Sequence, residues 1–179
     1  MARLDPIHIV DYDPEWPVLF ERQRARLEPA LAAWVTGPVE HIGSTAVPGL
    51  PAKPIVDMAV LIADHGRGAE IASALAPLGW LPAPEPSDAV RRRWSFCYPS
   101  VERRTCHLHV LEAGEPSWEV LLRFRDHLRR HPADAAEYGA VKRELAAADR
   151  DDRPRYRAGK APFITGILRV IESEENEEG

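Results

Sequence analysis

The sequence predicts an α+β fold whose C-terminal third is helical. Two observations support this. Short apolar segments alternate with amphipathic ones up to about residue 111, and only helix-type periodicity follows. The chain has 179 residues, of which 45% are hydrophobic and 28% charged, as in an ordinary globular protein. We therefore expect one domain over residues 1–171.

The N-terminal part is predicted to hold an extended segment, a helix and a strand. Residues 7–12 alternate apolar and polar side chains, which indicates a short strand or an extended arm. Asp13, Pro14 and Glu15 are typical of a helix start, and the apolar stripe continues to Trp34. A short strand over residues 39–42 follows.

The middle of the chain is predicted to complete a sheet. Residues 43–54 form a loop rich in Gly, Ser and Pro. Residues 55–62 are apolar except for Asp57, so we expect a strand that is buried on both faces. The strands at 39–42 and 55–62 should be neighbours in one mixed sheet. A helix is expected near 68–78, with further strands at 93–98 and 105–111.

The C-terminal third is predicted to contain three helices. One begins near Pro116, Pro132 separates it from the next, and a charged loop over residues 149–155 precedes the last. Residues 172–179 carry five glutamates, and we expect an acidic, disordered tail there.

Charge and composition narrow the partners and the compartment. The net charge is -5, and without the five tail glutamates 23 acidic residues would face 23 basic ones. A neutral body argues against nucleic acid as a partner. The sequence has two cysteines, no secretory signal and no apolar run of about 18 residues. These features predict a cytoplasmic protein that does not associate with membranes.

The segment from Glu40 to Val60 holds the candidate chemistry. Gly43, Ser44 and Thr45 offer a turn that a phosphate can approach closely, and Lys53 supplies a positive charge. Asp57 lies alone in an apolar strand, where an ionised carboxylate is costly unless it is paired or binds a metal. The alternative is an ordinary turn followed by an aspartate that caps a neighbouring loop. The segment lacks the ending of a P-loop and contains no dinucleotide fingerprint.

Several motifs in order resemble the GrpB family. They are EHIGSTAVPGLPAKPIVDMAV from residue 40, HLHV from 107, FRDHLRRHP from 124, YGAVKREL from 138 and RYRAGKAPFI from 155. The resemblance implies a nucleotidyltransferase-like fold, with a mixed β-sheet flanked by helices. In that superfamily a Gly-Ser pair holds triphosphate and paired acids hold a divalent metal. Gly43, Ser44 and Asp57 match this pattern, whereas Ala59 stands at the second acid position.

The remaining site residues follow from the same resemblance. His107 and His109 are two apart on an expected strand, so both should project from one face and could serve as metal ligands beside Asp57. Alternatively, they are structural histidines held by hydrogen bonds. Arg155 and Lys160 lie in the last motif and are candidates for phosphate binding. The set Arg91, Arg92 and Arg93 is more typical of a solvated turn.

These features predict a protein that binds a nucleoside triphosphate with Mg²⁺ or Mn²⁺. Nucleotidyl transfer to an unidentified acceptor is the associated reaction, with Asp57 and Lys53 as its catalytic residues. The alternative is a non-catalytic binding or chaperone-like protein connected with coenzyme A biosynthesis, because GrpB-like domains also occur fused to dephospho-CoA kinase. Ala59 favours this alternative, and the intact Gly43, Ser44 and Asp57 favour the enzyme.

Overall fold

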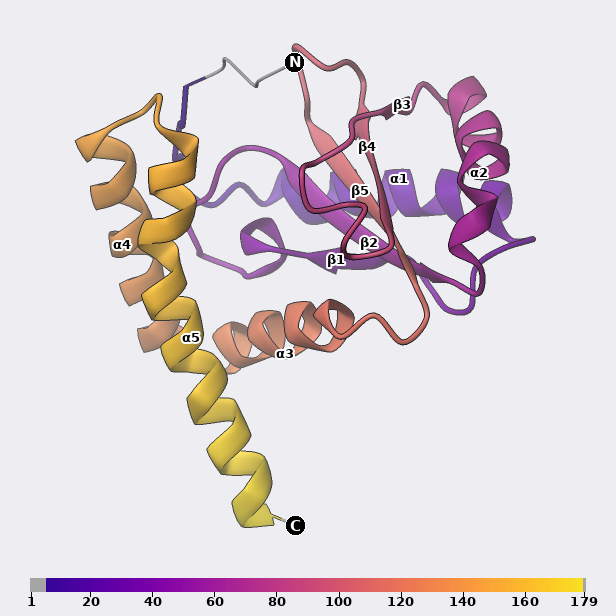
Figure 1. The fold of residues 1–179 in the computed structure, drawn as a ribbon. Coiled ribbons are helices and arrows are strands. Elements are labelled where there is room, and N and C mark those ends of the chain that lie inside the picture. The colour runs from indigo at the N-terminus through magenta and orange to yellow at the C-terminus, as the bar shows by residue number, and fades with distance from the viewer. Residues whose placement is uncertain (1–5, 179) are drawn as a thin grey trace.

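A five-stranded mixed sheet lies at the centre of the computed structural model, which describes residues 6–178 (Figure 1). The strands follow the spatial order β1 (Glu40–Ile42), β2 (Val56–Ile62), β5 (Cys106–Glu112), β4 (Arg93–Tyr98) and β3 (Leu81–Pro82). The helices are α1 (Glu15–Leu31), α2 (Gly68–Leu75), α3 (Ser117–Arg130), α4 (Pro132–Ala148) and α5 (Arg153–Glu178). The predicted α+β class and the helical C-terminal third are confirmed.

The pairing of the strands sets the register on which the site depends. β1 and β2 are antiparallel neighbours, as predicted, and Ile42 lies opposite Asp57. β2 and β5 run parallel, with Asp57 opposite His107 and Ala59 opposite His109. The β4–β5 and β3–β4 pairs are antiparallel. The sheet is therefore mixed, and the two central strands bring the sequence-predicted carboxylate and histidines side by side.

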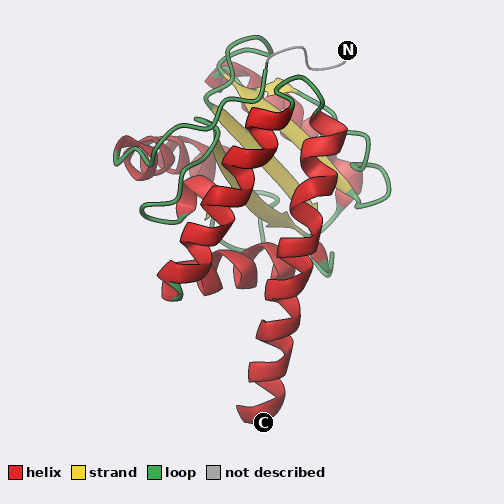
Figure 2. Ribbon diagram, turned by 90° about the vertical axis from the view of Figure 1, so that its left-hand side faces the viewer, coloured by secondary structure: helices red, strands yellow, loops and turns green. Residues whose placement is uncertain are grey.

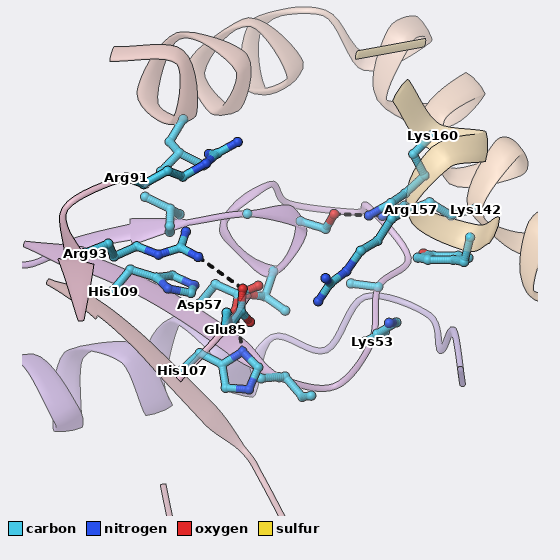
Figure 3. A pocket seen from close by; sticks show the side chains of 18 residues that line it. Lys53, Asp57, Glu85, Arg91, Arg93, His107, His109, Lys142, Arg157 and Lys160 are labelled. Atoms are coloured by element: carbon cyan, nitrogen blue, oxygen red, sulfur yellow. Dashed lines mark hydrogen bonds and ion pairs between the residues drawn. The ribbon is translucent and has the colours of Figure 1, made fainter. Parts of the chain in front are cut away.

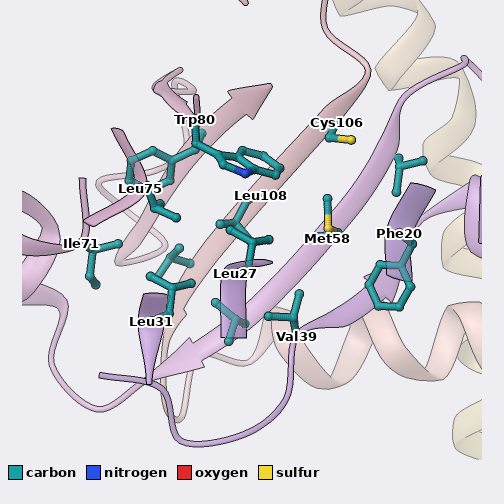
Figure 4. Packing of buried hydrophobic residues seen from close by; sticks show 14 of the residues in the cluster. Phe20, Leu27, Leu31, Val39, Met58, Ile71, Leu75, Trp80, Cys106 and Leu108 are labelled. Carbon is teal, nitrogen blue, oxygen red and sulfur yellow. The ribbon is translucent and has the colours of Figure 1, made fainter. Parts of the chain in front are cut away.

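One face of the sheet forms the main hydrophobic core. Val56, Met58 and Val60 alternate along β2 and are fully buried with Leu27 of α1 and Leu75 of α2. Figure 4 shows side chains from α1 and α2 packed onto this face of β2 and β5. Because side chains alternate across a strand, the intervening residues of β2 project from the opposite face. Asp57 is one of them, so the core itself forces it out of the apolar layer.

The opposite face is covered over only part of its length. Trp118 and Leu121 of α3 pack against Ala59 and Leu111 in a smaller apolar cluster. Asp57 lies beyond this cluster, at the beginning of β2. Helices α4 and α5 lie side by side across this region of the sheet, as Figure 2 shows from their side. A cavity lies at the end of the sheet that carries Asp57, lined by residues of the strands and of the C-terminal helices, and we call it the recess.

One short segment decides between two predicted alternatives, and another was not predicted. In residues 7–12 only Val10 bridges another strand-like residue, Ala52, so the segment is the extended arm rather than a strand. β3, which has only Leu81 and Pro82, was not predicted. Two residues are too few to show alternation, and proline is unfavourable in a strand interior.

The C-terminal helix is longer at both ends than expected. α5 begins at Arg153 and runs to Glu178 with Pro162 inside it, so residues 172–178 are helical where a disordered tail was predicted. Glutamate is a strong helix former, and Glu175 contacts Arg123 of α3 at 3.0 Å. Within the part of the chain that the structure describes, no helix combines the length and apolar character needed to cross a membrane.

Candidate functional site

The loop after β1 is shaped by a glycine that lies directly against Asp57. Gly43 has φ 71° and ψ -169°, a backbone conformation open almost only to glycine. A Cβ atom at this position would lie 3.0 Å from Oδ2 of Asp57. The turn Ser44–Ala46 follows, and the Thr45 hydroxyl is buried 3.0 Å from Nε2 of His41. The loop therefore presents its backbone and Ser44 beside the carboxylate.

Asp57, His107 and His109 form a compact group on one face of the sheet, which we call the Asp57 cluster (Figure 3). Nδ1 of His107 lies 3.2 Å from Oδ1 of Asp57. One ligand atom from each of the three residues lies within 4.8 Å of the other two. The prediction that at least one histidine shares the face of Asp57 is confirmed, and Asp57 remains 35% exposed to the recess.

His109 is held in a form suited to metal binding. Its Nδ1 lies 3.2 Å from Oγ of Ser95, whose hydroxyl in turn donates to Oδ1 of Asp88 at 3.0 Å. With its hydroxyl proton directed to the carboxylate, Ser95 accepts from Nδ1–H, which leaves a lone pair on Nε2 of His109. Burial lowers the pKa of His109 to about 4, so the imidazole is neutral at pH 7.

The wall opposite the cluster carries positive charge. The cavity has a volume of about 260 Å³ and is lined by Gly43, Ser44, Thr45 and the Asp57 cluster. Six basic side chains also line it, against the two acids Asp57 and Glu85. They are Lys53, Arg91, Arg93, Lys142, Arg157 and Lys160. Figure 3 shows the side chains of Lys142, Arg157 and Lys160 reaching in from the C-terminal helices.

Lys142 of α4 connects that wall to the loop. Its ammonium donates to Oγ of Ser44 at 2.9 Å and to the carbonyl oxygen of Pro51, and the residue is only 2% exposed. Burial, together with the charges of Lys160 and Arg143, lowers its pKa to about 7. The ammonium thus sits among neutral acceptors and other cations, which is a costly arrangement for a buried charge.

Two further lysines flank one aromatic ring. Nζ of Lys53 and Nζ of Lys160 each lie 4.7 Å from the centroid of the Tyr156 ring. Burial lowers the pKa of Lys160, and the charge of Asp57 opposes that shift. Tyr156 is itself buried, and both ammonium groups lie against its ring. Lys53 from the loop and Lys160 from α5 are thereby brought to one side of the cavity.

An apolar cavity adjoins the charged one, and several residues line both cavities. This second cavity, of about 240 Å³, is lined by Gly43, Ser44, Asp57 and Lys160 together with apolar side chains of the C-terminal helices. The main apolar contributors are Val120, Leu121, Phe124, Leu128 and Ile164. The site therefore joins a charged compartment to an apolar one at Asp57.

The structure gathers most of the sequence-predicted residues and adds others. Arg155 is exposed on α5 and does not line the cavity, because the helical repeat directs Tyr156, Arg157 and Lys160 inward instead. In the supposed solvated turn, Arg93 is buried in ion pairs with Asp88 and Glu85. Lys142 and Arg157 were missed, although both lie in the motifs that carry the family resemblance.

Comparison with known proteins decides the family. The family described as GrpB protein matches residues 6–170. The chain belongs to the GrpB family. It is 40% identical to a UPF0157 protein of Streptomyces coelicolor, covering 90% of this chain and 82% of that protein. A UPF0157 protein of Bacillus subtilis is 33% identical over 88% of this chain, which spans 45% of that protein.

Other comparisons bear on the GrpB fold. The crystal structure of GrpB from Enterococcus faecalis superimposes with a TM-score of 0.81 at 29% identity, covering 94% of this chain and 99% of that one. The structure of Cid1 with its short product ApU matches 75% of this chain and 42% of Cid1, with a TM-score of 0.50 at 11% identity. The fold is therefore nucleotidyltransferase-like.

A dephospho-CoA kinase of Mycolicibacterium paratuberculosis is 27% identical over 92% of this chain and 46% of its own length.

Proposed function

We propose that this GrpB protein binds a nucleoside triphosphate with a divalent metal at the Asp57 cluster, and transfers a nucleotidyl group to an acceptor. The observation that carries the proposal is the division of one cavity into two walls. Oxygen and nitrogen ligands lie on the strands, and three basic side chains, Lys142, Arg157 and Lys160, reach the cavity from the helices α4 and α5. A polyphosphate that chelates a metal needs both ligands for the metal and positive charge for the phosphates. The six basic side chains that line the cavity outnumber its two acids, so the positive charge is not fully neutralised.

The donor set fits a divalent metal, with a preference among metals. Asp57 and His109 would hold the ion, and His107 would either bind it or orient the Asp57 carboxylate through Nδ1. One carboxylate with imidazoles is a softer set than the oxygen-only shell of Mg²⁺, so we expect Mn²⁺ to bind more tightly. Ala59 contributes no ligand, and phosphate oxygens would complete the shell. When bound, the metal would supply positive charge at the transferred phosphate.

The basic residues would act by positioning and charge neutralisation. Ser44 and the backbone after Gly43 would hold the terminal phosphates, with Lys142 beneath them. Transfer would form a bond from the acceptor oxygen or nitrogen to the α-phosphorus, release the acceptor's proton to solvent, and break the bond from the α-phosphorus to the oxygen that bridges to the β-phosphate, so pyrophosphate leaves. Lys53 and Lys160, fixed around Tyr156, lie where they can neutralise the charge of that leaving group.

The adjoining apolar cavity distinguishes a nucleotide from a bare polyphosphate. It opens from the same residues, Gly43, Ser44 and Asp57, and offers Phe124 and Leu121 as contact surface for a base. We therefore expect ATP or another nucleoside triphosphate to bind more tightly than inorganic triphosphate at equal metal concentration.

A calorimetric titration tests the proposal. Each of the four ribonucleoside triphosphates is titrated into the protein with Mn²⁺, with Mg²⁺ and with EDTA. We expect binding that requires metal and is tighter with Mn²⁺. Absence of binding by all four nucleotides at millimolar concentration with Mn²⁺ would overturn the proposal.

Nucleotide binding is also expected to depend on pH through Lys142. Its pKa of about 7 in the free protein should rise when an anion arrives, because the bound phosphate favours the charged form. Below pH 7 the lysine is already protonated, whereas above pH 7 binding must take up a proton. Affinity should therefore fall as pH rises from 7 to 9, by up to about tenfold per pH unit. Calorimetry in buffers of different ionisation enthalpy measures the uptake.

A matched variant isolates this effect from the other charges nearby. Lys160 and Arg143 also act on Lys142, and Lys160 has a lowered pKa of its own, so part of the pH dependence can remain. Lys142→Arg keeps a positive charge throughout the range and should flatten the profile between pH 7 and 9. An unchanged proton uptake in Lys142→Arg would contradict the role given to Lys142.

A non-catalytic binding function is the second candidate, and Ala59 favours it. Chemistry that relies on paired acids is weakened when only Asp57 remains, whereas phosphate binding is not. The likeness to a dephospho-CoA kinase suggests a role beside that enzyme in coenzyme A biosynthesis. Release of pyrophosphate distinguishes the candidates. Tight nucleotide binding without pyrophosphate release, in the presence of alcohols, amines and RNA as acceptors, would favour the binding function.

A further inference from the structure

A second group of metal-ligating side chains lies where α3 meets α4. It consists of His127 in the last turn of α3, His131 between the helices and Asp134 in the first turn of α4, and we call it the elbow cluster. One ligand atom from each residue lies within 4.8 Å of the others. None of the three lines the Asp57 cavity. The elbow cluster is therefore separate from the proposed nucleotide site.

The hydrogen bonds of the elbow cluster leave ligand atoms available. Nδ1 of His131 lies 2.9 Å from the carbonyl oxygen of His127, which can only accept, so this nitrogen carries the proton. Neutral His131 then has its lone pair on Nε2. Hydrogen bonding of one ring nitrogen to a backbone carbonyl is the usual arrangement in histidines that bind metal through the other.

His127 is buried and directs one ring nitrogen at Asp134. The residue is 1% exposed, Nε2 lies 2.6 Å from Oδ2 of Asp134, and Nδ1 is buried. Among the described residues, no hydrogen-bond partner reaches Nδ1. Its ring also stacks on that of His131, with centroids 4.0 Å apart. Because Nε2 already faces the Asp134 carboxylate, it is the atom of His127 that would bind an ion shared with Asp134.

We propose that His127, His131 and Asp134 bind a transition metal ion of the Zn²⁺ class. Two imidazoles and one carboxylate are a ligand set found in four-coordinate zinc sites, where the protein supplies three ligands and water occupies the fourth position. The ion would join the end of α3 to the start of α4. Because α4 carries Lys142, the site would hold one wall of the charged cavity in place without touching it.

The test distinguishes metal binding at the elbow cluster from metal binding at the Asp57 cluster by substituting ligands of the Asp57 cluster. The background protein carries Asp57→Asn and His109→Ala, and it is titrated with Zn²⁺ or Co²⁺ alone in a buffer free of phosphate. We expect one equivalent of metal to bind, with a rise in melting temperature for Zn²⁺ and visible absorption bands for Co²⁺. Adding His131→Ala should weaken binding at least tenfold, and Asp134→Asn should do so as well.

Two controls keep the result interpretable. His8→Ala removes an exposed histidine outside both clusters and should leave the metal affinity unchanged. Far-ultraviolet circular dichroism verifies that each variant is folded, and His131→Asn replaces His131→Ala if the latter is not. If the background protein binds no Zn²⁺, or if the folded His131 and Asp134 variants bind it as tightly as the background does, the elbow cluster is only a structural hydrogen-bond group. The outcome does not depend on whether nucleotides bind.

Discussion

Asp57→Asn is expected to abolish metal-dependent nucleotide binding while leaving the fold as stable as before. The substitution keeps the shape of the side chain but removes the only carboxylate of the Asp57 cluster. Loss of a metal ligand should lower the affinity for the Mn²⁺–nucleotide complex by roughly 100-fold or more. Asp57 is 35% exposed and contacts His107 at 3.2 Å, and partly exposed pairs contribute at most about 1 kcal/mol. We therefore expect the melting temperature to be unchanged or raised.

Calorimetry and thermal unfolding together measure both parts of this prediction. Asp88→Asn is a suitable comparison, since Asp88 also contacts the site indirectly but serves the structure by bonding Arg93 and Ser95. Its loss should cost stability, about 1–3 kcal/mol, because the buried Arg93 then keeps only one of its two carboxylate partners, Glu85. If instead Asp57→Asn is clearly destabilised and still binds nucleotide with metal, Asp57 is a structural residue.

Gly43→Ala should impair the site through backbone geometry alone. At φ 71° and ψ -169° an alanine is strained by about 1–3 kcal/mol. Its Cβ would also lie 3.0 Å from Oδ2 and 3.3 Å from Cβ of Asp57, so the loop or the carboxylate must move. We expect lower stability and a loss of nucleotide affinity of at least tenfold, as measured by chemical denaturation and calorimetry.

Gly49→Ala provides the matched control for backbone strain. Gly49 has φ 78°, and a Cβ there would meet nothing within 4 Å. This variant should therefore lose stability to strain and keep its nucleotide affinity. Equal loss of affinity in the two variants would show that the effect of Gly43→Ala arises from general destabilisation and not from the position of Asp57.

The sequence allowed the central part of the site to be predicted because its residues follow strand periodicity. Asp57 interrupts one apolar strand. His107 and His109 are two residues apart on another, so their side chains project from the same face. The only missing information was that β2 and β5 are neighbours in a register that places Asp57 opposite His107. The nucleotidyltransferase-like resemblance implied a shared site, and the pairing of the strands brings these side chains together.

The helical wall was harder to predict because it is assembled from distant segments. Lys142 reaches Ser44 across 98 residues, and no local pattern distinguishes it from a lysine on a solvated helix face. The sequence predicts a charged loop over residues 149–155, and a loop has no periodicity that would distinguish Arg155 from Arg157. With the helix beginning at Arg153, the repeat that directs Tyr156, Arg157 and Lys160 inward becomes evident.

A crystal structure with Mn²⁺ and a non-hydrolysable nucleoside triphosphate tests the central claim most directly. The account predicts an anomalous peak for Mn²⁺ within coordination distance of Asp57 and a histidine of the cluster. It also predicts phosphates against Ser44 and Lys142, with the base in the cavity beside Phe124. Nucleotide bound elsewhere on the protein, or Mn²⁺ bound without contact to Asp57, would contradict it.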